Sequence, residues 1–238
     1  MPRNRIDGGH GDSVVPVWIP AADLELAGDL AIPDDAAGVV VFAHGSGSSR
    51  HSPRNRLVAD RLVDAGFATL LFDLLTTDED DAEHRGAHLR FDVATLGERL
   101  VAAVRWLATV SAVGQLPIGT FGASTGAAAA LIAAADLPDR IQAVVSRGGR
   151  PDLADGALPR VQAPTLLLVG ANDPLVLQLN RQALAQLGGP ARLDIIPGAG
   201  HLFEEPGALD EVVERAAAWF TEHLVHRLGG RLESPWST

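Results

Sequence analysis

Residues 117–134 read PIGTFGASTGAAAALIAA, and this stretch decides the fold more than any other part of the chain. A short apolar run is followed by a glycine-flanked serine and then by an alanine-rich run that is typical of a helix. Gly122-Ala123-Ser124-Thr125-Gly126 matches the pattern G-x-S-x-G, in which a serine occupies a sharp turn between a strand and a helix. Glycines on both sides let the two backbones approach closely. The sequence therefore predicts a strand–turn–helix unit that exposes Ser124.

The rest of the chain repeats this alternation of short apolar runs and longer amphipathic stretches, which is typical of βα units around a mostly parallel sheet. Residues 14–19 and 24–32 are expected to form an opening antiparallel pair. The later runs are continuously apolar, as in strands that helices cover on both faces. We expect these later strands at residues 38–43, 68–72, 117–121, 141–146, 165–169 and 192–196.

Helix-forming stretches separate the expected strands. In residues 93–110 the apolar side chains recur at helical spacing with charged residues between them, as in an amphipathic helix that lies on a sheet. Residues 76–88 (TTDEDDAEHRGAH) carry five acidic residues. We interpret them as a polar loop, either a solvated connector or a lid at the mouth of a cleft. Further helices are expected at residues 55–65, 124–134, 177–187 and 209–228.

These patterns together predict the α/β class: a mostly parallel, twisted sheet of about eight strands, with helices on both faces and no large cap domain. A chain of 238 residues with 47% hydrophobic content can bury a sizeable core. We therefore expect a single domain over residues 1–238, in which residues 1–12 and 229–238 are loosely ordered.

Composition excludes several kinds of site and partner. The 19 Lys and Arg residues and 30 Asp and Glu residues give a formal net charge of −11, which disfavours nucleic acid as a partner. The absence of cysteine excludes disulfides, thiolate metal sites and a cysteine nucleophile. Residues 1–13 lack the apolar core of a secretory signal, and the most apolar helical run falls short of the ~20 residues that span a bilayer. We expect a cytoplasmic protein without a membrane partner, and a homodimer is left open.

Two polar residues follow later strands at positions that suit a serine nucleophile. Asp173 follows the run at 165–169, and His201 follows the run at 192–196. In open α/β sheets the carboxyl ends of the strands form the active-site crevice. A serine hydroxyl needs a base that takes its proton and an acid that orients the base. The chain order Ser124, Asp173, His201 therefore predicts a catalytic triad.

Each of these residues also has a structural alternative. Asp173 precedes Pro-Leu, so it also suits the N-cap of the next helix. The alternative for His201 is an ordinary loop histidine. The alternative for the pentapeptide is a glycine–serine turn that matches the elbow pattern by chance. His44 follows the run at 38–43 and is better suited to bonding its own loop than to acting as a base. The remaining histidines lie in polar loops or on helix surfaces.

The loop His44-Gly45-Ser46-Gly47-Ser48-Ser49 occupies the place from which a loop supplies half of an oxyanion hole. We expect the main-chain N–H groups of Ser46 and Thr125 to be the two donors, each of which would lower the barrier by roughly 3 to 4 kcal/mol. The loop fits neither the G-x-x-x-x-G-K-[ST] nor the G-x-G-x-x-G pattern of nucleotide sites. No metal or organic cofactor is expected.

Four segments, HGSGSS, GASTG, GANDPLV and PGAGHLFEEPG, together resemble the α/β-hydrolase superfamily over nearly the whole chain. The compact length and the segments SSRHSPRN and GHLFEEPG are similar to the dienelactone hydrolase-like family, especially to hydrolases that are fused to phosphoribosyltransferase domains. The resemblance implies cofactor-free hydrolysis of an ester or lactone by Ser124, Asp173 and His201. It also implies that arginines bind an anionic substrate group, and the candidates here are Arg50, Arg54, Arg147 and Arg150.

One departure from the family broadens the expected activity. Dienelactone hydrolases proper carry a cysteine in the elbow, where this chain has Ser124. We therefore expect a carboxylic ester hydrolase that acts on small soluble esters or lactones through an acyl-enzyme intermediate. A thioesterase, a peptidase or another acyl-transfer enzyme would use the same triad, and a non-catalytic binding protein on the same fold is the remaining alternative.

Overall fold

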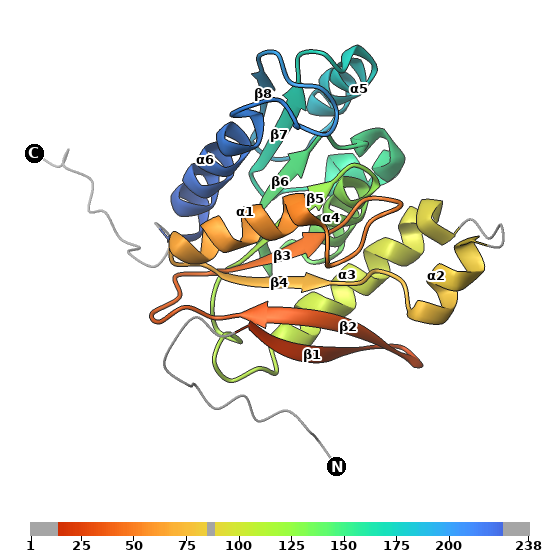
Figure 1. Ribbon diagram of the computed structural model, residues 1–238, viewed down its shortest axis with the longest axis vertical. Coiled ribbons are helices and arrows are strands. Elements are labelled where there is room, and N and C mark those ends of the chain that lie inside the picture. Colours follow the sequence, from red (N-terminus) through yellow and green to blue (C-terminus); the bar gives the residue numbers. More distant parts are fainter. Residues whose placement is uncertain (1–13, 85–88, 226–238) are drawn as a thin grey trace, which may run out of the picture.

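The computed structural model describes residues 14–84 and 89–225, through which one eight-stranded sheet runs (Figure 1). The expected strands are confirmed, with ends that differ by at most two residues. They are β1 (Val14–Ala21), β2 (Leu24–Ala31), β3 (Val39–Ala43), β4 (Ala68–Phe72), β5 (Ile118–Ala123), β6 (Ile141–Arg147), β7 (Thr165–Gly170) and β8 (Ala191–Ile196).

The strand order is β1-β2-β4-β3-β5-β6-β7-β8. β1 pairs with β2 and β2 with β4 in antiparallel fashion, and every later pair is parallel. This is the mostly parallel α/β architecture that the alternation predicted, and no large cap covers the sheet in the described ranges. The carboxyl ends of β3, β5, β7 and β8 consequently meet along one edge, where the predicted site residues follow them.

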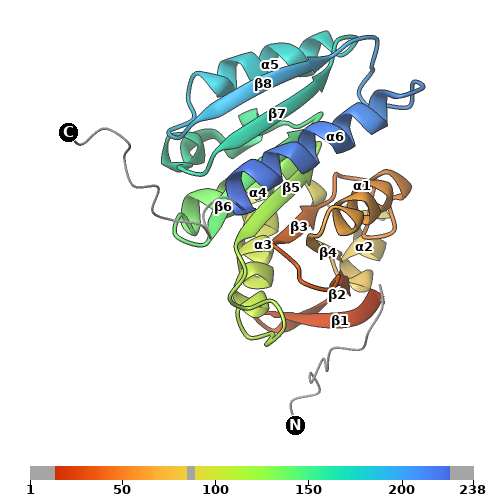
Figure 2. The same cartoon turned by 90° about the vertical axis from the view of Figure 1, so that its left-hand side faces the viewer.

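Helices cover both faces of this sheet (Figures 1 and 2). One face is packed by α1 (Pro53–Asp64) and α6 (Ala208–Phe220), and the other by α3 (Val93–Leu107), α4 (Thr125–Asp136) and α5 (Pro174–Leu184). The helix starts follow ordinary capping chemistry, since the side chains of Ser52 and Asp92 accept from the backbone N–H three residues on. None of the described helices is long and apolar enough to cross a membrane.

The interpretation of residues 76–88 as a loop is wrong for their first half, which forms α2 (Thr77–His84). Thr76 and Glu79 form a capping box, because the Thr76 Oγ1 accepts from the Glu79 N–H and the Glu79 carboxylate accepts from the Thr76 N–H. Acidic residues in the first turn also suit the positive end of the helix dipole. The charge run is thus a helix start, and residues 85–88 lie outside the described part.

Two further expectations need correction or qualification. β8 is an edge strand in which only Ile196 is buried, although α5 and α6 contact it from opposite faces. The α-helix expected at 209–228 ends at Phe220 and is followed by a π-helical turn, Thr221–Val225. Two short 3₁₀ turns within Pro151–Arg160, separated by a kink at Asp155, were not expected. The expectation of loose order at residues 1–12 and 229–238 concerns residues outside the described ranges.

A buried ion pair joins α2 to α3. The two terminal nitrogens of Arg99 lie 2.8 and 2.6 Å from the carboxylate oxygens of Glu79, and Arg99 Nη1 also donates to the carbonyl of Leu74 at 2.6 Å. Burial by itself would raise the pKa of Glu79, but hydrogen bonds from Arg99 and Thr76 outweigh it and lower that pKa below its usual value. Arg99 is 8% exposed, so the loss of its partner would leave a buried charge unpaired.

Glu79→Gln is expected to lower the free energy of unfolding by about 2 kcal/mol at neutral pH. The exposed Asp78→Asn makes the same charge change on the same helix and should have little effect. Because folding lowers the pKa of Glu79, its contribution is complete above the usual carboxyl range and disappears as the pH falls through the folded-state pKa. Urea unfolding of both variants at several pH values would measure this, and equal losses in the two variants would contradict it.

Candidate active site

Ser124 stands at the turn between β5 and α4 with φ 52° and ψ −122°, a conformation that non-glycine residues rarely adopt. Its N–H donates to the carbonyl of Arg147 at 3.2 Å, and its own carbonyl accepts from Ala127 at 3.1 Å and from Arg150 at 3.0 Å. Ser124 occupies the N-cap of α4, yet its side chain makes no capping hydrogen bond. Ser124 is half-buried, and its hydroxyl is not used as a helix cap.

The glycines that flank the elbow are required by close backbone contacts. A Cβ on Gly122 would lie 2.4 Å from the Cα of Ala127, and a Cβ on Gly126 would lie 2.2 Å from the carbonyl oxygen of Ala43. Neither position has room for a side chain. α4 thus packs directly against the ends of β3 and β5, and this packing places Ser124 beside the loop that follows β3.

Asp173 and His201 form a direct contact. Asp173 is the N-cap of α5, where its Oδ1 accepts from the Val176 N–H at 3.4 Å, and its Oδ2 lies 2.7 Å from His201 Nδ1. Both interpretations of Asp173, as helix cap and as partner of the histidine, therefore hold. A carboxylate only accepts hydrogen bonds, so Nδ1 carries the proton and Nε2 of the neutral ring is left with a lone pair, as a general base requires.

The end of β6 connects this pair to the serine. The Arg147 carbonyl accepts from the Ser124 N–H, and the next residue, Gly148, packs against His201: a Cβ built on Gly148 would lie 3.6 Å from His201 Nδ1. Gly148 has φ 52°, which favours glycine there. Ser124, Asp173 and His201 thus follow β5, β7 and β8 at one edge of the sheet. The His201 side chain is 40% exposed there, within reach of solutes.

The loop after β3 contacts the elbow directly. A Cβ on Gly45 would lie 3.0 Å from the Cβ of Ser124. The Ser46 N–H, an expected oxyanion donor, donates at 2.8 Å to Oγ1 of Thr125, the residue whose N–H is the other expected donor. The sequence did not reveal this hydroxyl contact. It joins the two halves of the expected oxyanion hole.

His44 has a structural position, as expected. Its Nδ1 donates to the Gly45 carbonyl at 3.0 Å, and its Nε2 accepts from the Leu74 N–H at 2.9 Å. His44 is buried, and these contacts place it between the loop and the segment that follows β4. Its ring therefore supports the loop and lies apart from the Asp173–His201 pair.

The four candidate arginines differ sharply in their partners. Arg50 is bonded to Asp73 through its N–H and its guanidinium, Arg150 forms two bonds of 2.8 and 2.7 Å with Asp152, and Arg54 contacts the exposed Glu204 at 3.0 Å. By contrast, no described residue forms a hydrogen bond or ion pair with the guanidinium of Arg147.

Arg147 is therefore an unpaired cation in the interior. It is 8% exposed, and burial, together with the positive charge of Arg54, lowers the pKa of Arg147 to about 10. A buried charge without a partner is costly to the folded state. In the described ranges, no three His, Asp or Glu side chains are grouped to hold a metal ion.

The chain is similar to known proteins in sequence and in fold. A model of the dienelactone hydrolase family matches residues 26–228. Two proteins of Mycobacterium tuberculosis, from strains CDC 1551 and H37Rv, are each named "Putative phosphoribosyl transferase" and are 55% identical to this chain over 208 residues. The match covers 87% of this chain and 46% of each relative, so the chain spans about half the length of these proteins.

Solved structures show the same fold. Dienelactone hydrolase from Anabaena variabilis is 55% identical, with a TM-score of 0.87 over 89% of this chain and 98% of that one. Est1E from Butyrivibrio proteoclasticus is 17% identical, with a TM-score of 0.72, and the match covers 87% of this chain and 98% of that one. An esterase from Pyrococcus furiosus is 18% identical, with a TM-score of 0.69, and the match covers 93% of this chain and 97% of that one.

Proposed function

The chain belongs to the dienelactone hydrolase family and is a hydrolase, and we propose that it cleaves carboxylic esters or lactones of small soluble molecules by a Ser124–His201–Asp173 triad. The observation that carries this proposal is the 2.7 Å contact between Asp173 and His201 at the sheet edge where strained Ser124 is presented. A histidine oriented by a carboxylate supplies the base that a serine hydroxyl needs.

In the proposed reaction, His201 Nε2 takes the Ser124 hydroxyl proton as Ser124 Oγ attacks the carbonyl carbon of the ester. The resulting imidazolium is stabilised by Asp173 and then donates its proton to the leaving alcohol oxygen as the C–O bond breaks. The acyl group remains on Ser124 as an ester. Water, deprotonated by His201, attacks this acyl-enzyme, and the product acid leaves as Ser124 regains its proton.

We assign stabilisation of the tetrahedral oxyanion to the N–H groups of Ser46 and Thr125. Before substrate binds, Thr125 Oγ1 accepts the Ser46 N–H. In this contact Thr125 Oγ1 only accepts, so the Ser46 N–H holds the loop against Thr125 and is then shared between Oγ1 and the oxyanion. The preformed arrangement avoids the cost of ordering the loop during the reaction.

The name of the Mycobacterium tuberculosis relatives raises a second possibility, phosphoribosyl transfer, for the part of those proteins that matches this chain. Two observations favour hydrolysis instead. The family model spans residues 26–228, and the loop after β3 packs on the strained Ser124. We propose that this chain corresponds to the hydrolase portion of such proteins.

The alternatives of thioesterase and peptidase use the same triad and differ only in the leaving group.

We further propose that the substrate carries an anionic group that binds Arg147. Arg147 ends β6, which lies between β5 and β7, and therefore stands on the His201 side of Ser124. His201 protonates the leaving group, so the leaving alcohol occupies this side. An anion on the alcohol portion would complete the coordination that Arg147 lacks, with Arg54 as a second cation nearby.

Asp173→Asn tests the triad without removing the helix cap, because Asn caps helices as well as Asp does. The amide favours the wrong tautomer of His201, so kcat should fall by about 10⁴-fold, as in serine proteases, with little change in Tm. Asp92→Asn makes the same substitution at the N-cap of α3 and should leave kcat unchanged. The assay is p-nitrophenyl acetate hydrolysis, with Ser124→Ala as the inactive reference. Turnover near wild type in Asp173→Asn would reduce Asp173 to a helix cap.

Arg147→Met tests the anion site, because it removes the charge and keeps an apolar side chain of similar length. Wild type should prefer 4-acetoxybenzoate over its neutral methyl ester by roughly 10 to 100-fold in kcat/KM, after correction for intrinsic reactivity, and the variant should lose this preference. Arg56→Met, at an exposed arginine that pairs with Asp29, is the control. Thermal stability should be maintained, since a buried unpaired charge is replaced by an apolar group. A preference that persists in Arg147→Met would refute the site.

A further inference from the structure

A small recess lies against the loop that contacts Ser124. Its lining consists of His44, Gly45 and Ser46 from the loop after β3, Leu74 and Leu75 after β4, and Leu96 of α3. Its volume is about 10 Å³, which accommodates one water-sized or methyl-sized group. Three leucines form its outer wall, so it favours an apolar occupant over a polar one.

The wall of this recess is held in place from both sides. The N–H of Leu74 donates to His44 Nε2 at 2.9 Å, and its carbonyl accepts from Arg99 Nη1 at 2.6 Å. Arg99 is in turn paired with Glu79. Leu74, Leu75 and Leu96 are all at most 7% exposed. Moving the Leu74 backbone outward would break these buried hydrogen bonds, so this part of the wall resists displacement.

The position of the recess relative to His201 indicates which part of an ester it faces. In the sheet order β4-β3-β5-β6-β7-β8, Asp173 and His201 follow β7 and β8 on one side of β5, and the recess follows β3 and β4 on the other. The leaving alcohol must approach His201 to receive a proton. The acyl substituent then extends from the carbonyl carbon toward the opposite side, where the recess lies.

We propose that this recess is the acyl-binding site and that Leu75 and Leu96 restrict the acyl group to about the size of acetyl. The inference rests on the proposed esterase activity and adds its acyl specificity. A longer chain would have to displace the buried leucine wall or turn out into solvent. Either way it loses favourable contacts in the transition state that an acetyl methyl group retains.

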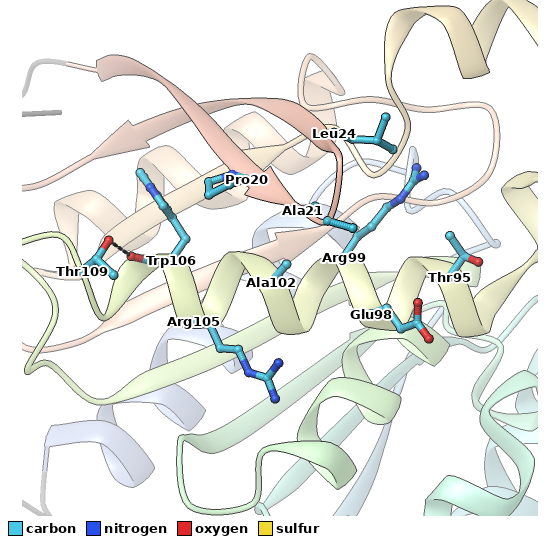
Figure 3. A pocket seen from close by; sticks show the side chains of 11 residues that line it. Pro20, Ala21, Leu24, Thr95, Glu98, Arg99, Ala102, Arg105, Trp106 and Thr109 are labelled. Carbon is cyan, nitrogen blue, oxygen red and sulfur yellow. Dashed lines mark hydrogen bonds between the residues drawn. The ribbon is translucent and has the colours of Figure 1, made fainter. Parts of the chain in front are cut away.

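A much larger cavity elsewhere does not offer an alternative acyl site. It has a volume of about 570 Å³ and lies between the β1–β2 turn and the outer side of α3, where Pro20, Leu24, Ala102 and Trp106 line it (Figure 3). It contains none of the residues that surround Ser124. A long acyl chain bound to Ser124 therefore gains nothing from it.

The test compares kcat/KM for p-nitrophenyl acetate, butyrate and hexanoate, which share one leaving group. Wild type should favour acetate over hexanoate at least about tenfold. Leu96→Ala and Leu75→Ala should each raise the ratio of butyrate to acetate by roughly tenfold, because each removes part of the wall. Leu57→Ala, which makes the same truncation at an exposed position on α1, should leave the ratio unchanged.

The ratio of two substrates in one preparation is independent of the folded fraction, so a destabilised Leu96→Ala variant still gives an answer. Wild type that hydrolyses hexanoate as fast as acetate would overturn the acyl assignment. So would an unchanged ratio in both leucine variants. If hydrolysis is nevertheless lost in Ser124→Ala, only the acyl assignment fails and the proposed esterase function stands. If Ser124→Ala still hydrolyses the acetate ester, both proposals fail.

Discussion

The strained backbone of Ser124 is the constraint on which the rest of the site depends. A positive φ at a non-glycine residue costs about 1 to 3 kcal/mol, and it persists only where neighbouring contacts over-determine it. Here Arg147 and Arg150 hold the turn through the backbone, and the glycines at 122 and 126 let α4 lie against β3 and β5. The same close packing brings Gly45 against the serine. The proposed nucleophile, the N-terminus of α4 and the proposed oxyanion loop are therefore positioned by one set of steric contacts.

From this turn the site divides along the sheet into two sides with different chemistry. Toward β6, β7 and β8 lie the groups that carry charge or protons: Arg147, Asp173 and His201. Toward β3 and β4 lie Ser46 with its hydrogen bond to Thr125 and the leucine wall that His44 and Arg99 hold. An ester bound across Ser124 would be oriented by this difference, with its polar alcohol portion on one side and a small apolar acyl group on the other.

The sequence predicted β3 to β7 well because each is a continuous apolar run whose burial follows from the parallel sheet. Chain order and strand-end placement singled out Asp173 and His201, whose side chains meet in the fold. The sequence predicted less where a residue's role depends on a distant partner. The acidic residues after Thr76 form a helix because Glu79 meets Arg99, twenty positions later, and caps Thr76. β8 resembles an enclosed strand in sequence, yet it lies at the sheet edge. The isolation of Arg147 and the Thr125–Ser46 contact likewise arise only in the folded chain.

We propose that His201 and Asp173 activate Ser124. The most direct measurement is labelling with a fluorophosphonate, which reacts at a useful rate only with an activated serine, followed by mass mapping of the modified peptide. We expect one label per chain, located on Ser124 and absent from the His201→Ala variant. A label on Ser46 or Ser48 with Ser124 unmodified, or equal labelling of Ser124 in wild type and His201→Ala, would contradict it.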